Sequence, residues 1–489
     1  MSAYDDLLAY QRQSSALGQV AGRLGWDQET MMPEGAAPQR AEESAAMSSI
    51  LHARASDPKV ADWLEKAKAP DEAGASILKK IRKSHDRATK VPGDLAAEIA
   101  RVTSLSQGVW AKARAEEDFA SFAPTLAEVV RLKREEAAAL ADGRSLYDTC
   151  LDDFEEGMTS ETLAAMFGAL RPRLVALKDK LLGAPAPLAL RGQFDETAQV
   201  ELATEIAGRF GYDFKHGRMD KAVHPFSSGS GLDVRITTRT DAADPFNCIY
   251  STIHEVGHAH YEQGIDRAYL LTPLGRGASM GVHESQSRIF ENQFGRSREF
   301  AGWLFDAMVE RFGPLNTRDA DAFYAAVNRV SAGYIRTEAD EVHYNLHILM
   351  RSDLERDLVE GDLAVEDLPE AWNTRFEADF GVAVDKPSNG CLQDVHWSVG
   401  LFGYFPTYTL GNVYAGCLYQ ALKADLPTLE DDLAKGDPSA AVTWLRERLQ
   451  AYGSLRDPED TITHAIGAKP TAEPLLSYLE NKFGALYRL

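Results

Sequence analysis

The chain is poor in cysteine and in basic residues, and both shortages exclude classes of protein. Its 489 residues include four cysteines, none in CxxC spacing, which argues against a disulfide framework and a thiolate metal site. Lysine and arginine number 52 against 74 aspartates and glutamates, so the formal net charge is −22. Such a surface repels nucleic-acid phosphates and anionic membranes, and we expect neither as a partner.

Long apolar runs are also missing. No stretch of about 18 apolar residues occurs, which argues against a transmembrane helix. The first 15 residues lack the basic start and apolar core of a secretory signal, so we expect a cytoplasmic location. Repeats, low-complexity tracts and long linkers are absent too. The pattern therefore predicts one folded domain over residues 1–489.

What the chain does contain is mostly amphipathic helix. Ala, Leu, Glu, Lys and Arg dominate, and apolar residues recur at three- and four-residue intervals, as in Phe122–Leu140. The segment His224–Thr240 differs, because Ser and Gly turn residues precede an alternation of Val234, Ile236 and Thr238 with polar neighbours. We expect an all-α fold with a small β-hairpin in this segment, either as a wall of the active site or as a surface hairpin.

A metal-binding motif follows the predicted hairpin, inside a predicted helix. Asp244 is a helix cap, Pro245 suits the first helical position, and Gly264 suits a left-handed stop. Within this helix lies HEVGH, whose His254 and His258 are four residues apart and so point from one face. That spacing suits two ligands of zinc, although a hydrogen-bonded pair of core histidines is the alternative.

A third ligand is expected because catalytic zinc usually takes three protein ligands and a water. The extended form HExxHxxGxxH is absent, since Tyr261 and Gly264 occupy the places of its Gly and third His. The helical segment Val282–Asn292 supplies Glu284, with His283 as an adjacent competitor. We favour Glu284 because a His₂Glu set is usual for peptidases of this type.

Six motifs occur in order along the chain and carry a family resemblance. They are HPF from His224, DVRIT from Asp233, HEVGH from His254, HESQ from His283, IRTEAD from Ile335 and GCLQDVHW from Gly390. In this order they resemble the thermostable carboxypeptidase (carboxypeptidase Taq) family of zinc metallopeptidases. Two departures concern local packing, because Phe290 replaces an expected tryptophan and His260 takes an apolar place in the family's helix.

The resemblance implies a two-lobed, mostly helical metallopeptidase with a deep central groove and the small β element beside the active site. It also implies a homodimer that removes single residues from peptide C-termini with broad specificity. It supports Glu284 as the third zinc ligand, with Co²⁺ as an alternative metal. The substrates would be peptides with a free C-terminus.

The catalytic roles follow from the chemistry of peptide hydrolysis. Glu255, rotated about 100° from His254, lies beside the metal, where it can take a proton from water and deliver it to the leaving amine. The resemblance assigns Tyr408 to the developing oxyanion, with His396 as an assistant. Buried Tyr and His residues with an ordinary hydrogen bond are the alternative for both.

The substrate-binding roles rest on the resemblance. Arg336 is the candidate for the C-terminal carboxylate, which a guanidinium can bind with two parallel donors. Arg235 is the reserve, and its motif closes one end of the groove in the family. His224 is a candidate for contact with the peptide backbone. Asp340 or Asp394 is a candidate for orienting a ligand imidazole.

Two other functions stay open at the level of sequence. A zinc oligopeptidase that cuts internally or releases dipeptides would need the same ligands and base. A helical peptide-binding protein with an inactive site would retain the fold without the chemistry, and the intact Glu255 argues against it.

Overall fold

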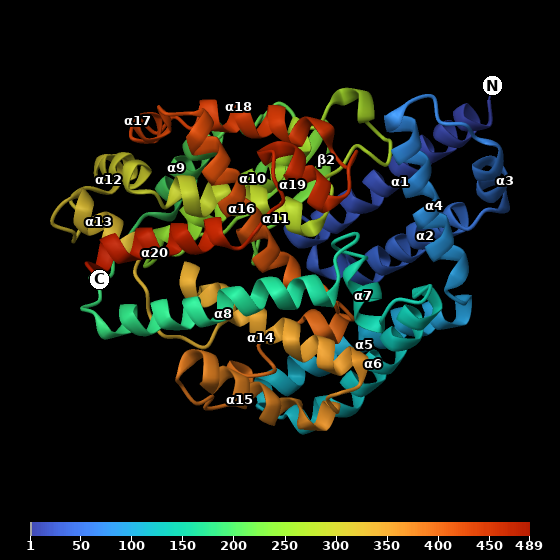
Figure 1. Ribbon diagram of the computed structural model, residues 1–489, viewed down its shortest axis with the longest axis horizontal. Coiled ribbons are helices and arrows are strands. Elements are labelled where there is room, and N and C mark those ends of the chain that lie inside the picture. The colour runs from blue at the N-terminus through green and yellow to red at the C-terminus, as the bar shows by residue number, and fades with distance from the viewer. Residues whose placement is uncertain (1) are drawn as a thin grey trace. The chain divides into compact units, whose positions relative to one another are not determined.

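The structure is a computed structural model that describes residues 2–489 (Figure 1). Helices hold 69% of the chain, which confirms the predicted helical class. The chain divides into two compact units, each built from three stretches. Unit 1 runs to Thr89 and continues with Pro187–Asn328 and Tyr414–Pro470, whereas unit 2 combines Lys90–Ala186, Arg329–Val413 and Thr471–Leu489. The single domain over residues 1–489 stays a prediction.

Unit 1 contains most of the helices and all three strands. Its elements are α1 (Ala3–Thr30), η1 (Glu34–Ala36), α2 (Ala37–Ala55), α3 (Pro58–Lys66), α4 (Glu72–Lys90), α9 (Glu196–Arg209), β1 (Met219–Lys221), β2 (Ser227–Ser230), β3 (Asp233–Thr238), α10 (Pro245–Gly264), η2 (Arg267–Tyr269), α11 (Met280–Arg288), the π-helix η3 (Ile289–Gly295), α12 (Arg298–Phe312), α13 (Ala320–Val327), α17 (Leu429–Leu433), α18 (Ser439–Arg448), η8 (Gln450–Tyr452) and α19 (Pro458–Ile466).

Unit 2 is helical in all its described elements. They are α5 (Gly93–Glu116), α6 (Phe119–Leu140), α7 (Leu146–Leu151), α8 (Ser160–Gly183), η4 (Arg336–Glu338), α14 (Glu341–Glu360), η5 (Val365–Asp367), α15 (Leu368–Phe380), η6 (Pro387–Asn389), η7 (His396–Val399) and α20 (Glu473–Tyr487), with α16 (Pro406–Asp425) continuing into unit 1. Helix α14 packs against α8 and α15 (Figure 1) and is buried along most of its length. Over residues 2–489, no helix combines the length and apolarity that crossing a membrane needs.

The predicted hairpin is present and forms part of a three-stranded sheet. Strands β2 and β3 pair antiparallel, and β1 adds a parallel strand on the other side of β3 that the sequence analysis missed. Alternation buries Val234 and Ile236. The sheet is joined to α10, because Thr252 donates a hydrogen bond to Thr238 Oγ1 at 2.9 Å. The β element therefore lies directly against the helix that carries the HEVGH motif.

Helix α10 begins as the sequence predicts but ends differently. Asp244 caps it by accepting a hydrogen bond from Phe246 N at 3.1 Å, and Pro245 takes the first position. The left-handed stop at Gly264 is wrong, because Gly264 is the last helical residue and the helix ends as Ile265 turns extended, with φ −62° and ψ 139°. Gly264 instead makes room for Gln450, whose Oε1 lies 2.8 Å from where a Cβ would stand.

Helices α10 and α11 approach each other closely at a second glycine. A Cβ on Gly257, inside the HEVGH motif, would lie 2.5 Å from the carbonyl oxygen of Gln286 and from Ser287 Cα. Only a glycine allows this backbone approach. The contact brings Glu284, two residues before Gln286 on α11, toward the histidines of α10.

Candidate metal centre

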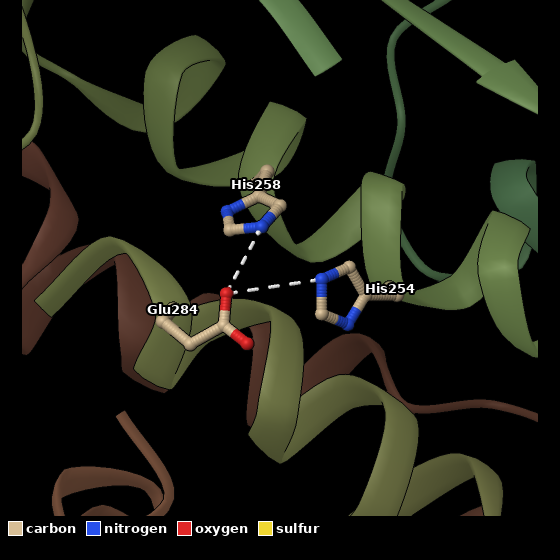
Figure 2. A group of neighbouring side chains, drawn as sticks. All are labelled: His254, His258 and Glu284. Carbon is tan, nitrogen blue, oxygen red and sulfur yellow. Dashed lines mark ion pairs between the residues drawn. The ribbon is translucent and has the colours of Figure 1, made fainter. Parts of the chain in front are cut away.

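Three predicted ligands converge in unit 1. His254 and His258 extend from α10 and Glu284 from α11, and Figure 2 shows both imidazoles directed at the Glu284 carboxylate. Glu284 Oε2 lies 3.8 Å from His254 Nε2 and 3.4 Å from His258 Nε2. One ligand atom from each residue lies within 4.8 Å of the other two. The sequence-predicted set is thus brought together as a group.

These separations fit a single small cation. Donors about 2.1 Å from a common zinc ion at tetrahedral angles are about 3.4 Å apart. The donor chemistry agrees, because two imidazoles and one carboxylate form a zinc set that leaves a position open. His283 does not compete for this place, since its Nδ1 lies 2.7 Å from the Nδ1 of His258.

The outward nitrogen of each histidine is held by another side chain. His254 Nδ1–H donates to Glu291 Oε2 at 3.0 Å. His283 Nε2–H donates to Glu262 Oε1 at 3.0 Å, which leaves His283 Nδ1 as the acceptor for His258 Nδ1–H. With the proton on Nδ1, the neutral form of each ligand histidine has its Nε2 lone pair facing Glu284. The two contacts select the tautomer that can bind a metal.

The charges around the group favour a neutral His258 imidazole beside an ionised Glu284 carboxylate, whereas Glu284 and Glu291 raise the pKa of His254 against the effect of burial. Burial lowers the pKa of His258 to about 4. Burial alone would raise the pKa of Glu284, but Arg288 and the two histidines hold it well below its ordinary value. Arg288 Nε donates to Glu284 Oε1 at 2.6 Å, which leaves Oε2 toward the histidines. This arrangement suits a divalent cation.

Glu255 lies in the same motif but is not part of the ligand group. Its side chain is buried, and its carboxylate has no hydrogen bond or ion pair to residues 2–489. Burial raises its pKa to about 7, with neighbouring His254 opposing the shift. A carboxyl of this kind can both accept and release a proton near neutral pH.

In unit 2, Asp394 binds the predicted Arg336 and a second arginine, Arg351. Arg336 Nη2 and Nε both donate to Asp394 Oδ1, at 2.9 and 3.0 Å, and Arg351 Nε donates to Oδ2 at 2.7 Å. All three side chains are buried or nearly so. Two guanidinium groups on one carboxylate leave one net positive charge, which favours an anionic ligand such as a carboxylate.

The same unit brings Tyr408 and His396 together. His396 Nε2 lies 3.2 Å from the hydroxyl of Tyr408, and the Arg336 guanidinium lies 5.1 Å from the centre of the Tyr408 ring. Burial lowers the pKa of His396 to about 4, so this imidazole is neutral at pH 7. Three predicted residues from three separate segments of the chain thus form one cluster.

The remaining two candidates lie on and beside the sheet of unit 1. Arg235 on β3 makes two hydrogen bonds to Asp233, at 2.8 and 3.0 Å, and its guanidinium lies 4.4 Å from the centre of the Trp26 ring. His224 is exposed in the bend between β1 and β2. Neither is part of the group formed by His254, His258 and Glu284.

Sequence reasoning missed the residues that orient the ligands. Asp340 caps α14 through Val342 and His343, and Asp394 binds the two arginines, so the carboxylates at the ligand histidines are Glu291 and, through His283, Glu262. The spacing of these glutamates from the ligands in the sequence could have indicated them. Glu291 follows Glu284 by seven residues and Glu262 follows His258 by four, and both intervals return to the same helix face.

The two departures from the family pattern contact each other. The ring centres of His260 and Phe290 are 5.8 Å apart, and both side chains are buried. A phenylalanine in place of a larger tryptophan leaves room beside α10 for an imidazole where an apolar side chain is expected. The paired change is one of packing and leaves the donor group intact.

A mostly helical fold with this donor set defines the class of helical metallopeptidases, and comparison with known proteins gives the family. The profile of the carboxypeptidase Taq (M32) metallopeptidases matches residues 6–483. Thermostable carboxypeptidase 1 of Thermus thermophilus is 41% identical, covering 99% of both chains. The chain therefore belongs to the carboxypeptidase Taq (M32) metallopeptidase family, as its motifs predict.

Solved structures agree with this assignment. The crystal structure of an M32 carboxypeptidase from Deinococcus radiodurans has a TM-score of 0.96 at 38% identity and covers 100% of both chains. Metallocarboxypeptidase 1 of Trypanosoma cruzi has a TM-score of 0.95 at 31% identity, covering 98% of this chain and 99% of its own. The similarity extends over essentially the whole length.

Proposed function

We propose that this chain is a zinc-dependent carboxypeptidase that releases single residues from peptide C-termini with broad specificity. The observation that carries the proposal is the group of partly buried His254 and His258 with buried Glu284, together with the unengaged carboxylate of Glu255 in the same motif. Membership of a metallocarboxypeptidase family supports the reaction class. The cytoplasmic location and the homodimer stay predictions from the sequence.

We assign the metal to His254, His258 and Glu284, with zinc as the resident ion and cobalt as an alternative. When bound, zinc polarises the scissile carbonyl and lowers the pKa of water toward about 7. Glu255 then accepts the proton of the attacking water as its oxygen bonds to the carbonyl carbon. As the C–N bond breaks, Glu255 passes that proton to the leaving nitrogen.

We assign peptide binding and charge stabilisation to the other candidates. Arg336 binds the C-terminal carboxylate, which the excess positive charge around Asp394 supports. Tyr408 donates its hydroxyl proton to the developing oxyanion, and His396 holds the Tyr408 oxygen. Arg235 limits how far the peptide enters, and His224 contacts its backbone.

A time course on one peptide, followed by mass spectrometry, tests this function. The zinc-loaded protein should shorten an unblocked peptide one residue at a time from its C-terminus and leave the C-terminally amidated peptide intact, because the amide lacks the charge that Arg336 binds. Internal fragments or dipeptides would instead establish an oligopeptidase. Binding of the peptide without cleavage would establish an inactive binding protein.

Replacement of the proposed base tests the mechanism. Glu255→Gln removes the proton acceptor at nearly constant volume, so kcat should fall by about 10²–10⁴-fold. Zinc content, measured by elemental analysis, should not change, because Glu255 is outside the donor group. Glu310→Gln, an exposed change on α12, is the matched control. A Glu255→Gln variant with undiminished kcat would refute the assignment.

A further inference from the structure

Glu355 is a buried carboxylate in unit 2 that the proposed mechanism does not use. It lies on α14 with no exposed surface, and three neutral donors bind it. Tyr147 Oη–H donates to Oε1 at 2.7 Å, Gly403 N–H donates to Oε1 at 3.2 Å, and Trp397 Nε1–H donates to Oε2 at 3.2 Å. No cationic side chain within residues 2–489 forms an ion pair with it.

A carboxyl group buried without a cation costs free energy, whether it stays charged or takes up a proton, so its place calls for a reason. A simple helix contact would be made more cheaply by an apolar side chain. The three donors come from α7, from η7 and from the segment just before α16. Glu355 therefore joins α7 to the segment that runs from η7 to the start of α16, which is distant from α7 in the sequence.

Two of these parts carry the residues proposed to stabilise the oxyanion. Trp397 directly follows His396, and Gly403 precedes Tyr408 by five residues. The two carboxylate oxygens thus bind the backbone leading to Tyr408 and the side chain next to His396. By binding both segments, Glu355 can maintain the 3.2 Å contact between His396 Nε2 and the Tyr408 hydroxyl.

The backbone at Gly403 has little freedom to move. Its φ is +81°, a conformation that favours glycine, and a Cβ there would lie 2.6 Å from the carbonyl carbon of Cys150 on α7. The amide of Gly403 is fixed by Glu355 Oε1, and Tyr147 on the same helix α7 binds that same oxygen. The segment is therefore held both by close packing and by the carboxylate.

We propose that Glu355 is a positioning residue that holds Tyr408 and His396 in the relation that peptide hydrolysis requires. The inference rests on the proposed function, because it assumes that Tyr408 stabilises the oxyanion. Catalytic groups tolerate little displacement, and an error of 1 Å can cost about 10²-fold in rate. Both oxygens of Glu355 can accept hydrogen bonds whether or not the carboxyl is protonated, whereas the N–H₂ group of glutamine accepts none, so glutamine at position 355 would loosen the anchor.

Steady-state kinetics on an unblocked peptide test the proposal with a two-residue cycle. Glu355→Gln should lower kcat by about 10–100-fold with KM little changed, because the loss falls on a transition-state contact. In a Tyr408→Phe background the same change should have little further effect, since residues that act as one unit are not additive. Glu360→Gln is the matched control. It lies on the same helix and accepts from Tyr147 N at 2.7 Å but not from Trp397 or Gly403.

Each alternative outcome overturns the inference in a recognisable way. A Glu355→Gln variant that melts earlier but keeps kcat would show a structural role only. If the fold-reductions in kcat from Glu355→Gln and Tyr408→Phe multiply fully in the double variant, the two residues act independently and the inference fails. If Tyr408→Phe alone keeps kcat, the oxyanion assignment in the proposed function fails as well.

A second variant covers the case in which Glu355→Gln does not fold. Trp397→Phe removes one of the three donors and keeps an aromatic ring. It should lower kcat less than Glu355→Gln and again show no further effect in the Tyr408→Phe background. A Trp397→Phe variant whose effect multiplies fully with that of Tyr408→Phe would refute the proposal.

Discussion

The contact between His283 and His258 makes a quantitative prediction about metal affinity. His283→Phe keeps a ring of similar size but removes the Nδ1 acceptor that lies 2.7 Å from His258 Nδ1. In the metal-bound state the His258 proton must stay on Nδ1, so the variant leaves a buried donor unpartnered, at a cost of about 1–3 kcal/mol. The free protein escapes this cost by moving the proton to Nε2, where Glu284 Oε2 is 3.4 Å away.

The cost therefore falls on metal binding. At about 1.4 kcal/mol per tenfold change, 1–3 kcal/mol weakens zinc binding by about 5- to 150-fold, in line with the effect of other residues that orient metal ligands. Competition with a chromophoric chelator at pH 7.5 measures the zinc Kd, and circular dichroism checks the fold. The control is His260→Phe, a change on α10 outside the donor group. A folded His283→Phe variant with wild-type zinc affinity would refute the tautomer argument.

Two further predictions concern stability. Gly257→Ala should destabilise the fold by about 1–3 kcal/mol, because its Cβ would lie 2.5 Å from the Gln286 carbonyl oxygen; thermal unfolding measures this, with Gly302→Ala as the control in open space, and an unchanged Tm would contradict it. Burial raises the pKa of Glu355 from an ordinary 4.5 to about 8 in the folded protein. Protonated Glu355 therefore makes its full contribution to the unfolding free energy below pH 4.5, and this contribution is lost as pH rises to 8. Between these values the unfolding free energy of the wild type should fall by about 1.4 kcal/mol per pH unit more than that of Glu355→Gln, as urea titrations at several pH values would measure; equal slopes would contradict the raised pKa.

The two histidine ligands could be predicted from the sequence because their spacing is local. His254 and His258 are four residues apart on one helix, and helical geometry alone puts both on one face. Glu284 needed the family pattern or a general rule for zinc sites, because its approach to α10 depends on packing at Gly257. The hairpin was likewise predicted from alternation, whereas the parallel strand β1 has only three residues and no detectable pattern.

The residues that orient the ligands were not predicted, because their contacts join distant positions. Glu291 is 37 residues from His254, His283 is 25 from His258, and Glu262 is 21 from His283. Their helical spacing gives a face but does not say which neighbour that face meets. A glutamate or histidine on a helix is by default a solvated residue, and only tertiary packing makes it a partner of a metal ligand.

Helix α14 shows the same limit for the proposed substrate-binding groups. Arg351 and Glu355 are four residues apart, a spacing typical of an exposed ion pair on a helix surface. Both are instead fully buried, and each binds elsewhere, Arg351 to Asp394 and Glu355 to the segments around Tyr408. The periodicity of charges on a helix cannot distinguish a solvent-exposed face from one covered by other segments. In this chain the covered charged face of α14 lies where the motifs IRTEAD and QDVHW meet. Buried charge on α14 is therefore better evidence of a functional contact than exposed charge elsewhere in the chain.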